Sequence, residues 1–321
     1  MAKGMRRTRD SLEGRSLALL LIALMLFQAA PLLTVSASTT PPQGSGDWTI
    51  NANEVAYLNS TDQALVQGDL HIHGELHING GNLFMWGASD NQRQLRVHSG
   101  GLLNVTNGGL IASFTSVYYT FVVDDFAHLR VTDSRIEKAS VIDSSSLNMT
   151  MTNVHLEDTQ LRLQDGSAQY WNGGETGVWD ASQNAFGANW VFDNLRFMNG
   201  TFGNAIHFYY YPSFSDWTLT LTDIDISIPS TASYYNTIEV AYDFSPNLVF
   251  DGLSISDATR QTSSYWQPAT ASLLRHSPYN SDLEIRNSLF YDSPEHTAIY
   301  SNSDIVLSNV TITDIYHPDQ T

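Results

Sequence analysis

The sequence contains no cysteine, and after Ser45 it has almost no segment with helical periodicity. The absence of cysteine excludes disulfide bridges and thiolate metal sites. With 321 residues, the chain is long enough for one large domain or two ordinary ones. A large domain buries enough apolar surface to be stable without disulfides. The apolar and aromatic content is that of a folded chain and not of a disordered one.

Basic residues are scarce, and a third of them lie before residue 16. They precede the apolar run LALLLIALMLF and the small-residue cleavage site Val35-Ser36-Ala37, which together are typical of an export signal. The sequence therefore predicts a signal helix within a signal peptide at residues 1–37, a linker at 38–47 and one folded domain at 48–321. An uncleaved membrane anchor is the alternative, because residues 16–35 are about one membrane span long.

In either case the rest of the chain is expected to be secreted or displayed at the cell surface, touching a membrane only through its N-terminal segment. Removing the five basic and two acidic residues of positions 1–37 from totals of 15 and 33 leaves ten basic and 31 acidic residues, with Lys138 the only lysine. Such a surface repels nucleic acid and anionic headgroups, so no nucleic-acid partner is expected. Carboxylates on stacked turns would instead suit calcium, which is the cofactor this composition favours.

A short repeat takes the place of helical patterns. An alternating strand, a turn residue and a second strand recur in segments such as LNVTNGGL at residue 103, LRVTDSRI at 129 and MTMTNVHL at 149. The spacing between turn residues varies from 20 to 41, which is typical of a solenoid whose coils carry loops of variable length. The turn residues are Asn107, Asp133, Asn153, Asn194, Asp223, Gly252, Asn287 and Asn309.

This repeat predicts a parallel β-helix, in which coils stack about 4.8 Å apart and each strand pairs with its counterparts in the neighbouring coils. Alternation places Leu, Val and Ile in the core and Thr, Arg and Asp outside. Asn, Asp and Gly tolerate the left-handed backbone that a sharp bend needs, so we expect that conformation at the turn residues and a ladder of hydrogen bonds between their side chains. A β-sandwich is the alternative all-β fold, but it would not need a shared turn motif.

Two segments, HSGGLLNVTNGGLIAS from His98 and NSLFYDSPEHTAIYSNSDIVLSNVTITDIY from Asn287, resemble the coils of right-handed parallel β-helix repeat proteins. The resemblance runs from about residue 68 to the C-terminus. It implies an all-β, single-stranded right-handed parallel β-helix of the exported type, a fold shared by pectate lyases, polygalacturonases, tailspikes and adhesins, and it does not specify an activity. No capping segment follows the last repeat, so we expect either a chain truncated at its C-terminal end or a cap supplied by a partner.

Four residues are candidates for catalysis. Asp124 and Asp125 resemble the paired aspartates of polygalacturonases, and the segment RIEK, Arg135 to Lys138, is similar to that family's Arg-x-Lys. The Gly-His-Gly and Asn-Thr-Asp motifs of the family are missing. Polysaccharide lyases of this fold use Arg or Lys near a calcium held by aspartates. Arg130 and Lys138, on neighbouring coils with Asp124, Asp125 and Asp133, would supply such a group. Acidic exposed loops are the alternative interpretation.

Aromatic pairs lie between the repeat strands, among them Tyr209-Tyr210 and Tyr265-Trp266. If they line one side of the solenoid, their rings would form a platform for stacking sugars. The alternative is that they pack the long loops onto the coils.

The segment GDLHIHGELHIN consists of two near copies of one pattern, which sends Leu and Ile to the core and the histidines outward. His71 and His73 then share a face of one strand, about 7 Å apart, and a pair so placed is able to chelate zinc.

The sequence favours a non-catalytic exported scaffold or adhesion module that binds polysaccharide or cell-surface glycans. A polysaccharide lyase or glycoside hydrolase is one alternative, and a structural stalk within a longer surface protein is the other.

Overall fold

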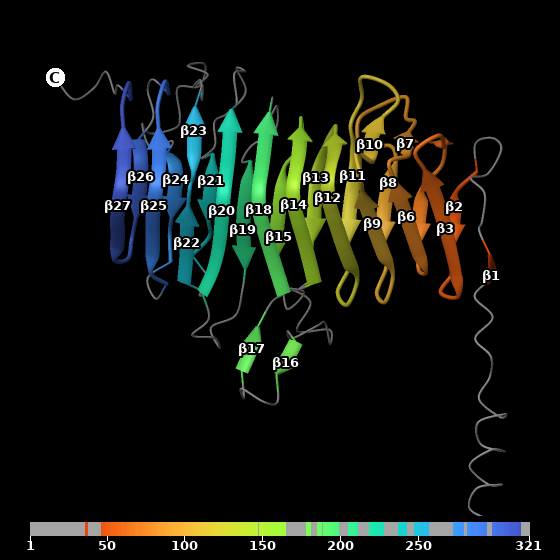
Figure 1. Cartoon of the computed structure of the whole chain (residues 1–321), viewed down its shortest axis with the longest axis horizontal. Helices are drawn as coiled ribbons and strands as arrows, with labels where there is room; N and C mark the ends of the chain where they lie inside the picture. The colour runs from red at the N-terminus through yellow and green to blue at the C-terminus, as the bar shows by residue number, and fades with distance from the viewer. Residues whose placement is uncertain are drawn as a thin grey trace, which may run out of the picture. The chain divides into compact units, whose positions relative to one another are not determined.

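The computed structural model describes residues 36–37, 46–146, 148–164, 178–180, 185–187, 189–198, 205–210, 218–227, 237–242, 247–256, 272–278, 281–293 and 297–315. All of them except Ser36 belong to a compact unit of residues 37–321. They contain strands and no helix, and most of the strands belong to two large parallel sheets (Figure 1). The all-β parallel architecture predicted from the repeat is therefore confirmed.

The smaller sheet has ten strands, all paired in parallel. In spatial order they are β2 (Trp48–Ile50), β5 (Leu70–Ile72), β8 (Gln94–Val97), β11 (Tyr119–Val123), β13 (Ala139–Ser144), β15 (Leu161–Gln164), β19 (Ile206–Tyr210), β21 (Ile238–Val240), β24 (Ser272–His276) and β26 (Thr297–Ser301).

The larger sheet contains the longer strands. Its strands are β3 (Glu54–Asn59), β4 (Gln63–Val66), β6 (Glu75–Asn79), β7 (Asn82–Met85), β9 (Leu102–Thr106), β10 (Leu110–Ser113), β12 (His128–Glu137), β14 (Asn148–Glu157), β18 (Asn189–Met198), β20 (Thr218–Ser227), β22 (Asn247–Asp251), β23 (Ser254–Ser256), β25 (Leu283–Phe290) and β27 (Ile305–Ile312). The two-residue strand β1 (Ser36–Ala37) belongs to the same sheet, next to β3. The antiparallel pair β16 (Val178–Asp180) and β17 (Ala185–Gly187) forms a separate two-stranded sheet.

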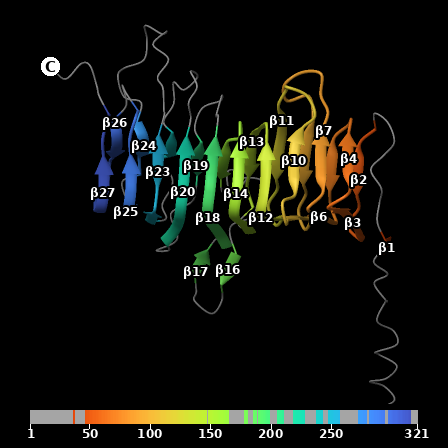
Figure 2. The same cartoon turned by 45° about the horizontal axis from the view of Figure 1, so that its top comes forward.

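The chain alternates between the two sheets, and each passage through both sheets forms one coil. Thus β5 of the smaller sheet is followed by β6 and β7 of the larger one, and β8 returns to the smaller sheet beside β5. Strands β4, β7 and β10 form a row that continues into the second half of β12, while β9 pairs with the first half (Figure 2). This stacking gives a parallel, solenoid-like architecture.

The core is made of side chains that stack on the same position of the next coil. Leu76, Leu103, Leu129 and Met149 are partners in the strand register, and each is fully buried. Burying one such side chain stabilises the fold by about 1.5–3 kcal/mol, but only where a neighbouring coil covers it. A single coil therefore cannot bury its own core, which is why the repeat is needed.

The turn residues change the phase of the alternation. In β12, Leu129 and Val131 point inward, Thr132 and Asp133 both remain outside, and Ser134 is buried again. The left-handed backbone at Asp133, with φ 49°, inserts this extra outward residue. At all eight turn residues named from the sequence, φ lies between 48° and 85°.

Side chains of these turns are hydrogen-bonded from coil to coil. The amide of Asn153 donates to Asp133 over 2.6 Å, and the amide of Asn194 donates to Asn153 over 3.1 Å. Further along, Asn309 donates to Asn287 over 2.8 Å and Asn287 donates to Asp251 over 2.8 Å. Gly252 has no side chain, so the preceding residue, Asp251, accepts the hydrogen bond from Asn287 at this turn.

The predicted signal peptide, apart from Ser36 and Ala37, and the predicted linker, apart from residues 46 and 47, lie outside the described residues. Within the part of the chain that the structure describes, no helix is long and apolar enough to cross a membrane.

Candidate functional site

The outer face of the larger sheet is hollowed where β12, β14 and β18 lie next to one another. In the register of these strands, Arg135 is the partner of His155, and His155 is the partner of Arg196, so two arginines flank one histidine. Neighbouring strands are about 4.8 Å apart, so this row extends roughly 10 Å across the strands. The lining combines turn residues with this row: Asp133, Asn153 and Asn194 with Arg135, His155 and Arg196.

The two arginines of the hollow differ in how they are paired. Nε of Arg135 lies 2.7 Å from Glu137, and its Nη2 bonds Glu157 of the next coil. Nε of Arg196 lies 3.6 Å from Asp225, and both side chains of this pair are about half exposed (54% and 45%). An exposed pair of this kind is worth less than about 1 kcal/mol. Of the two arginines in the hollow, Arg196 therefore loses less ion-pair energy when it binds a ligand.

The surroundings of His155 favour the neutral form of its ring. Burial lowers the pKa of its imidazole, and so do the charges of Arg196 and Arg135, against the opposite effect of Glu157 and Glu137. Its Nε2 is buried, and no hydrogen-bond partner for it is found among the described residues. A neutral ring with an unpartnered nitrogen is a potential contact for a polar ligand.

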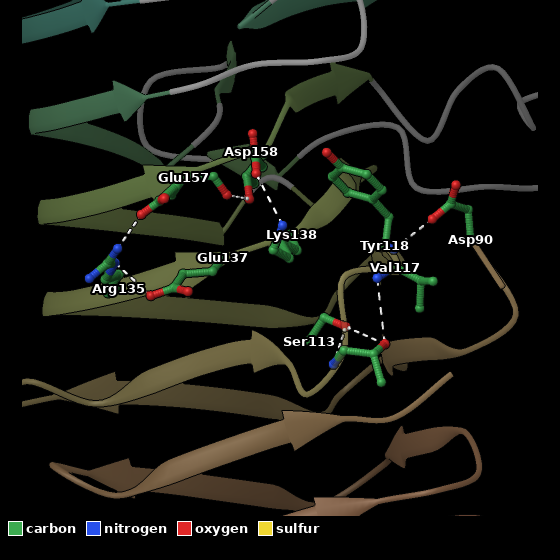
Figure 3. A network of polar contacts seen from close by, with 11 residues as sticks. Asp90, Ser113, Val117, Tyr118, Arg135, Glu137, Lys138, Glu157 and Asp158 are labelled. Atoms are coloured by element: carbon green, nitrogen blue, oxygen red, sulfur yellow. Dashed lines mark hydrogen bonds and ion pairs between the residues drawn. The ribbon is translucent and has the colours of Figure 1, made fainter. Parts of the chain in front are cut away.

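The four residues proposed for catalysis do not form one group. Asp124 and Asp125 follow β11 at a turn, and a carboxylate oxygen of Asp124 lies 2.9 Å from Nε of Arg96. Arg135 lies instead on the outer face of the larger sheet, with Glu137 and Glu157 as its partners (Figure 3). In the described structure Asp124 thus pairs on the side of the smaller sheet, away from the ion pairs of Arg135.

Lys138 occupies a corner between the sheets, where it has a left-handed backbone with φ 58°. Its Nζ lies 3.3 Å from Asp158 of the next coil and 5.5 Å from the ring centroid of Tyr118 (Figure 3). Asp158 is itself left-handed, with φ 49°, at the same corner. The contacts of Lys138 therefore tie neighbouring turns together. Asp292 and Asp314 are also left-handed.

A second polar cluster lies on the outer side of the smaller sheet, where β5 and β8 end. Nδ1 of His71 is 3.0 Å from Nε2 of His98. The ring of His73 stacks on that of His98, with centroids 3.9 Å apart and planes inclined by 11°. Nδ1 of His98 lies 3.4 Å from a carboxylate oxygen of Asp124. The structure thus adds a third histidine, 27 residues away in sequence, to the pair His71 and His73.

The predicted aromatic platform lies largely outside the part of the chain that the structure describes. Tyr209 and Tyr210 belong to β19, and their side chains lie outside the described part. Tyr265 and Trp266 lie outside the described residues altogether, so the aromatic platform stays a prediction. No group of three or more His, Asp and Glu side chains in the described ranges is arranged to hold a metal ion.

Sequence reasoning missed His98 and His155 and took Arg196 as an isolated arginine beside a repeat strand, although the repeat carries a signal for each. His98 follows the strand QLRV as His73 follows LHI, at the same place in the coil. Arg135, His155 and Arg196 each come two residues after a turn residue. Aligning the coils on their turn residues would have put this row together.

Comparison of the chain with models of protein families, with curated proteins and with solved structures gave no match. Its function must therefore be inferred from its own surfaces.

Proposed function

We propose that residues 48–321 form a right-handed parallel β-helix. The regular passage of the chain between two parallel sheets and the left-handed turn residues at matching places of the coils support this fold. The right hand follows from the general rule that connections between parallel strands of one sheet are right-handed in about 98% of cases.

We further propose that the protein is exported to the cell surface or secreted, and that it is a non-catalytic module that binds acidic polysaccharide. The observation that carries this proposal is the hollow on β12, β14 and β18, with Arg196 exposed and only loosely paired. Guanidinium groups bind carboxylates through paired hydrogen bonds, and amide side chains such as those of Asn153 and Asn194 match sugar hydroxyls.

The shape of the hollow also suits a chain-like ligand. Its polar side chains repeat from coil to coil, so a polysaccharide running across the strands would meet similar groups about every 4.8 Å. The surrounding surface is acidic, with a formal net charge of −18 for the chain. Binding of a polyanion therefore depends on the few arginines at the contact, and calcium would strengthen it by bridging carboxylates of both partners.

The test is a binding measurement with polygalacturonate as the probe, after a glycan array run with and without calcium. Arg196→Gln removes the exposed cation and is expected to weaken binding at least fivefold. Arg286→Gln is the matched control, because Arg286 is also on an outer face of the larger sheet but pairs with Glu284 outside the hollow. Equal binding by wild type and Arg196→Gln, or an array without any bound glycan, would refute the proposal.

An enzyme acting on acidic polysaccharide is the second candidate. The unpartnered Nε2 of His155 favours it, because a neutral imidazole beside two arginines is able to act as a general base near a substrate carboxylate. Incubation with polygalacturonate would then release unsaturated uronate products, and His155→Gln would abolish the release. Absence of product from the wild-type protein would exclude this lyase activity on polygalacturonate.

A further inference from the structure

From the cluster at the ends of β5 and β8, we infer a binding site for one divalent transition-metal ion of the kind that prefers imidazole, with His71 and His98 as its two protein ligands. One ring nitrogen of each histidine already faces the other ring, because Nδ1 of His71 and Nε2 of His98 are 3.0 Å apart. Two nitrogens at this separation would bind one ion at the usual metal–nitrogen distance of about 2.0–2.1 Å with an angle of about 94° between them. Such an angle suits adjacent positions of a tetragonal site, and water fills the remaining positions.

The ring of His98 is held in the orientation that this role needs. Its Nδ1 lies 3.4 Å from Asp124, while His73 stacks on its face at 3.9 Å between centroids. When Nε2 of His98 binds a metal ion, the ring proton resides on Nδ1, where the nearby carboxylate of Asp124 favours it. A carboxylate beside the outer ring nitrogen is a common arrangement around bound metal ions. His73 therefore positions His98 and is not itself a ligand, which differs from the pairing of His71 with His73 inferred from their spacing in the sequence.

The charges around the cluster permit a cation. Arg96 is the partner of His71 in the strand register, but its guanidinium is paired with Asp124 through Nε contacts of 2.9 and 3.1 Å. The side chains of His98 and Asp124 remain about one fifth exposed, so an ion reaches the site from solvent. Among divalent ions, Cu²⁺ binds imidazole most strongly, whereas Ca²⁺ prefers oxygen.

The site is tested by titrating the full chain with Cu²⁺, following heat by calorimetry and the coordinating nitrogens by electron paramagnetic resonance. We expect one tight equivalent with a spectrum of two imidazole nitrogens. His71→Ala and His98→Ala should each weaken that equivalent at least tenfold and remove one nitrogen from the spectrum. His77→Ala is the matched control, because His77 lies on β6 of the larger sheet and bonds Glu75.

Two further measurements separate the positioning residues from the ligands. Asp124→Asn should weaken Cu²⁺ binding by about 10–100-fold while two nitrogens stay in the spectrum. His73→Phe keeps a stacked ring and should bind as the wild type does. The inference is wrong if His98→Ala leaves the tight equivalent unchanged, if His73→Phe removes a coordinating nitrogen, or if Ca²⁺ competes with Cu²⁺ at equal concentration.

Discussion

Asn153 shows how one side chain serves a turn of this fold in two ways. Its backbone is left-handed, with φ 54°, a conformation that glycine adopts freely and that asparagine tolerates better than other residues with a Cβ. Its side chain also both donates and accepts in the ladder, joining Asp133 in the preceding coil to Asn194 in the next. The two contributions are separable by substitution.

We predict that Asn153→Ala lowers the free energy of unfolding by about 2–4 kcal/mol, because it adds the left-handed strain of alanine to the loss of two hydrogen bonds. Asn153→Gly loses the same hydrogen bonds but keeps the backbone freedom, so its loss should be about 1–2 kcal/mol smaller. Urea unfolding followed by circular dichroism measures both. Equal losses for Ala and Gly would show that the backbone conformation carries no cost at this position.

At the scale of elements, His276 at the end of β24 connects its strand to β26. The residue is fully buried, and its ring nitrogens lie 3.1–3.3 Å from the hydroxyls of Ser281, Ser301 and Ser303. Burial lowers the pKa of His276 to about 4. Its ring is therefore neutral in the folded protein at pH values where a histidine of the unfolded chain, with a pKa of 6.5, is already protonated.

The sign of the pH dependence follows from this difference. Above pH 6.5 the ring is neutral in both the folded and the unfolded state, so His276 does not lower the free energy of unfolding there. Between pH 6.5 and about 4 the unfolded chain takes up a proton that the folded protein excludes, so stability falls as the pH falls. The total loss from this residue is on the order of 3 kcal/mol.

We predict that His276→Gln flattens the decrease of the unfolding temperature between pH 6.5 and 4, whatever its effect at pH 7. The measurement is thermal unfolding at several pH values. His128→Gln, on β12 and outside this group of serines, serves as the control and should keep the wild-type slope. An unchanged slope for His276→Gln would mean that this ring is protonated in the folded protein.

At the scale of the whole molecule, β27 is the last strand of the larger sheet among the described residues. Within the described ranges β27 pairs only with β25. Leu283, Ile285 and Phe290 of β25 are fully buried, whereas their register partners Ile305, Leu307 and Ile312 are 37%, 48% and 48% exposed. An apolar strand with a free edge is a template for further pairing.

We therefore predict that the 321-residue chain associates with itself in a concentration-dependent way through this strand. Leu307→Gln, in an inward position, should weaken the association more than Val306→Gln, in the neighbouring outward position. Sedimentation velocity over a range of protein concentrations measures the effect. Equal behaviour of the two variants, or a wild-type protein that stays monomeric, would contradict the prediction.

The inward positions and the turns could be predicted from the sequence because each depends on one residue and its nearest neighbours. Leu70, Ile72, Leu76 and Ile78 go to the core because alternation with period two leaves no other face for them. The left-handed turns are marked by Asn, Asp or Gly, since few other residues tolerate that backbone conformation. Lys138 had no such mark, and its left-handed corner could be found only in the structure.

The sites depend instead on which coils are neighbours, and this only the tertiary structure decided. His98 lies beside His71 across 27 residues, and Asn194 beside Asn153 across 41. Loops of different length separate the coils, so distance along the chain does not give distance in space. The sequence by itself determined the repeat, the core and the turns. The stacking of the coils then assembled each of the two sites, the hollow around His155 on one sheet and the histidine cluster on the other. Parallel pairing aligns equivalent positions of successive coils, whatever the length of the loop between them.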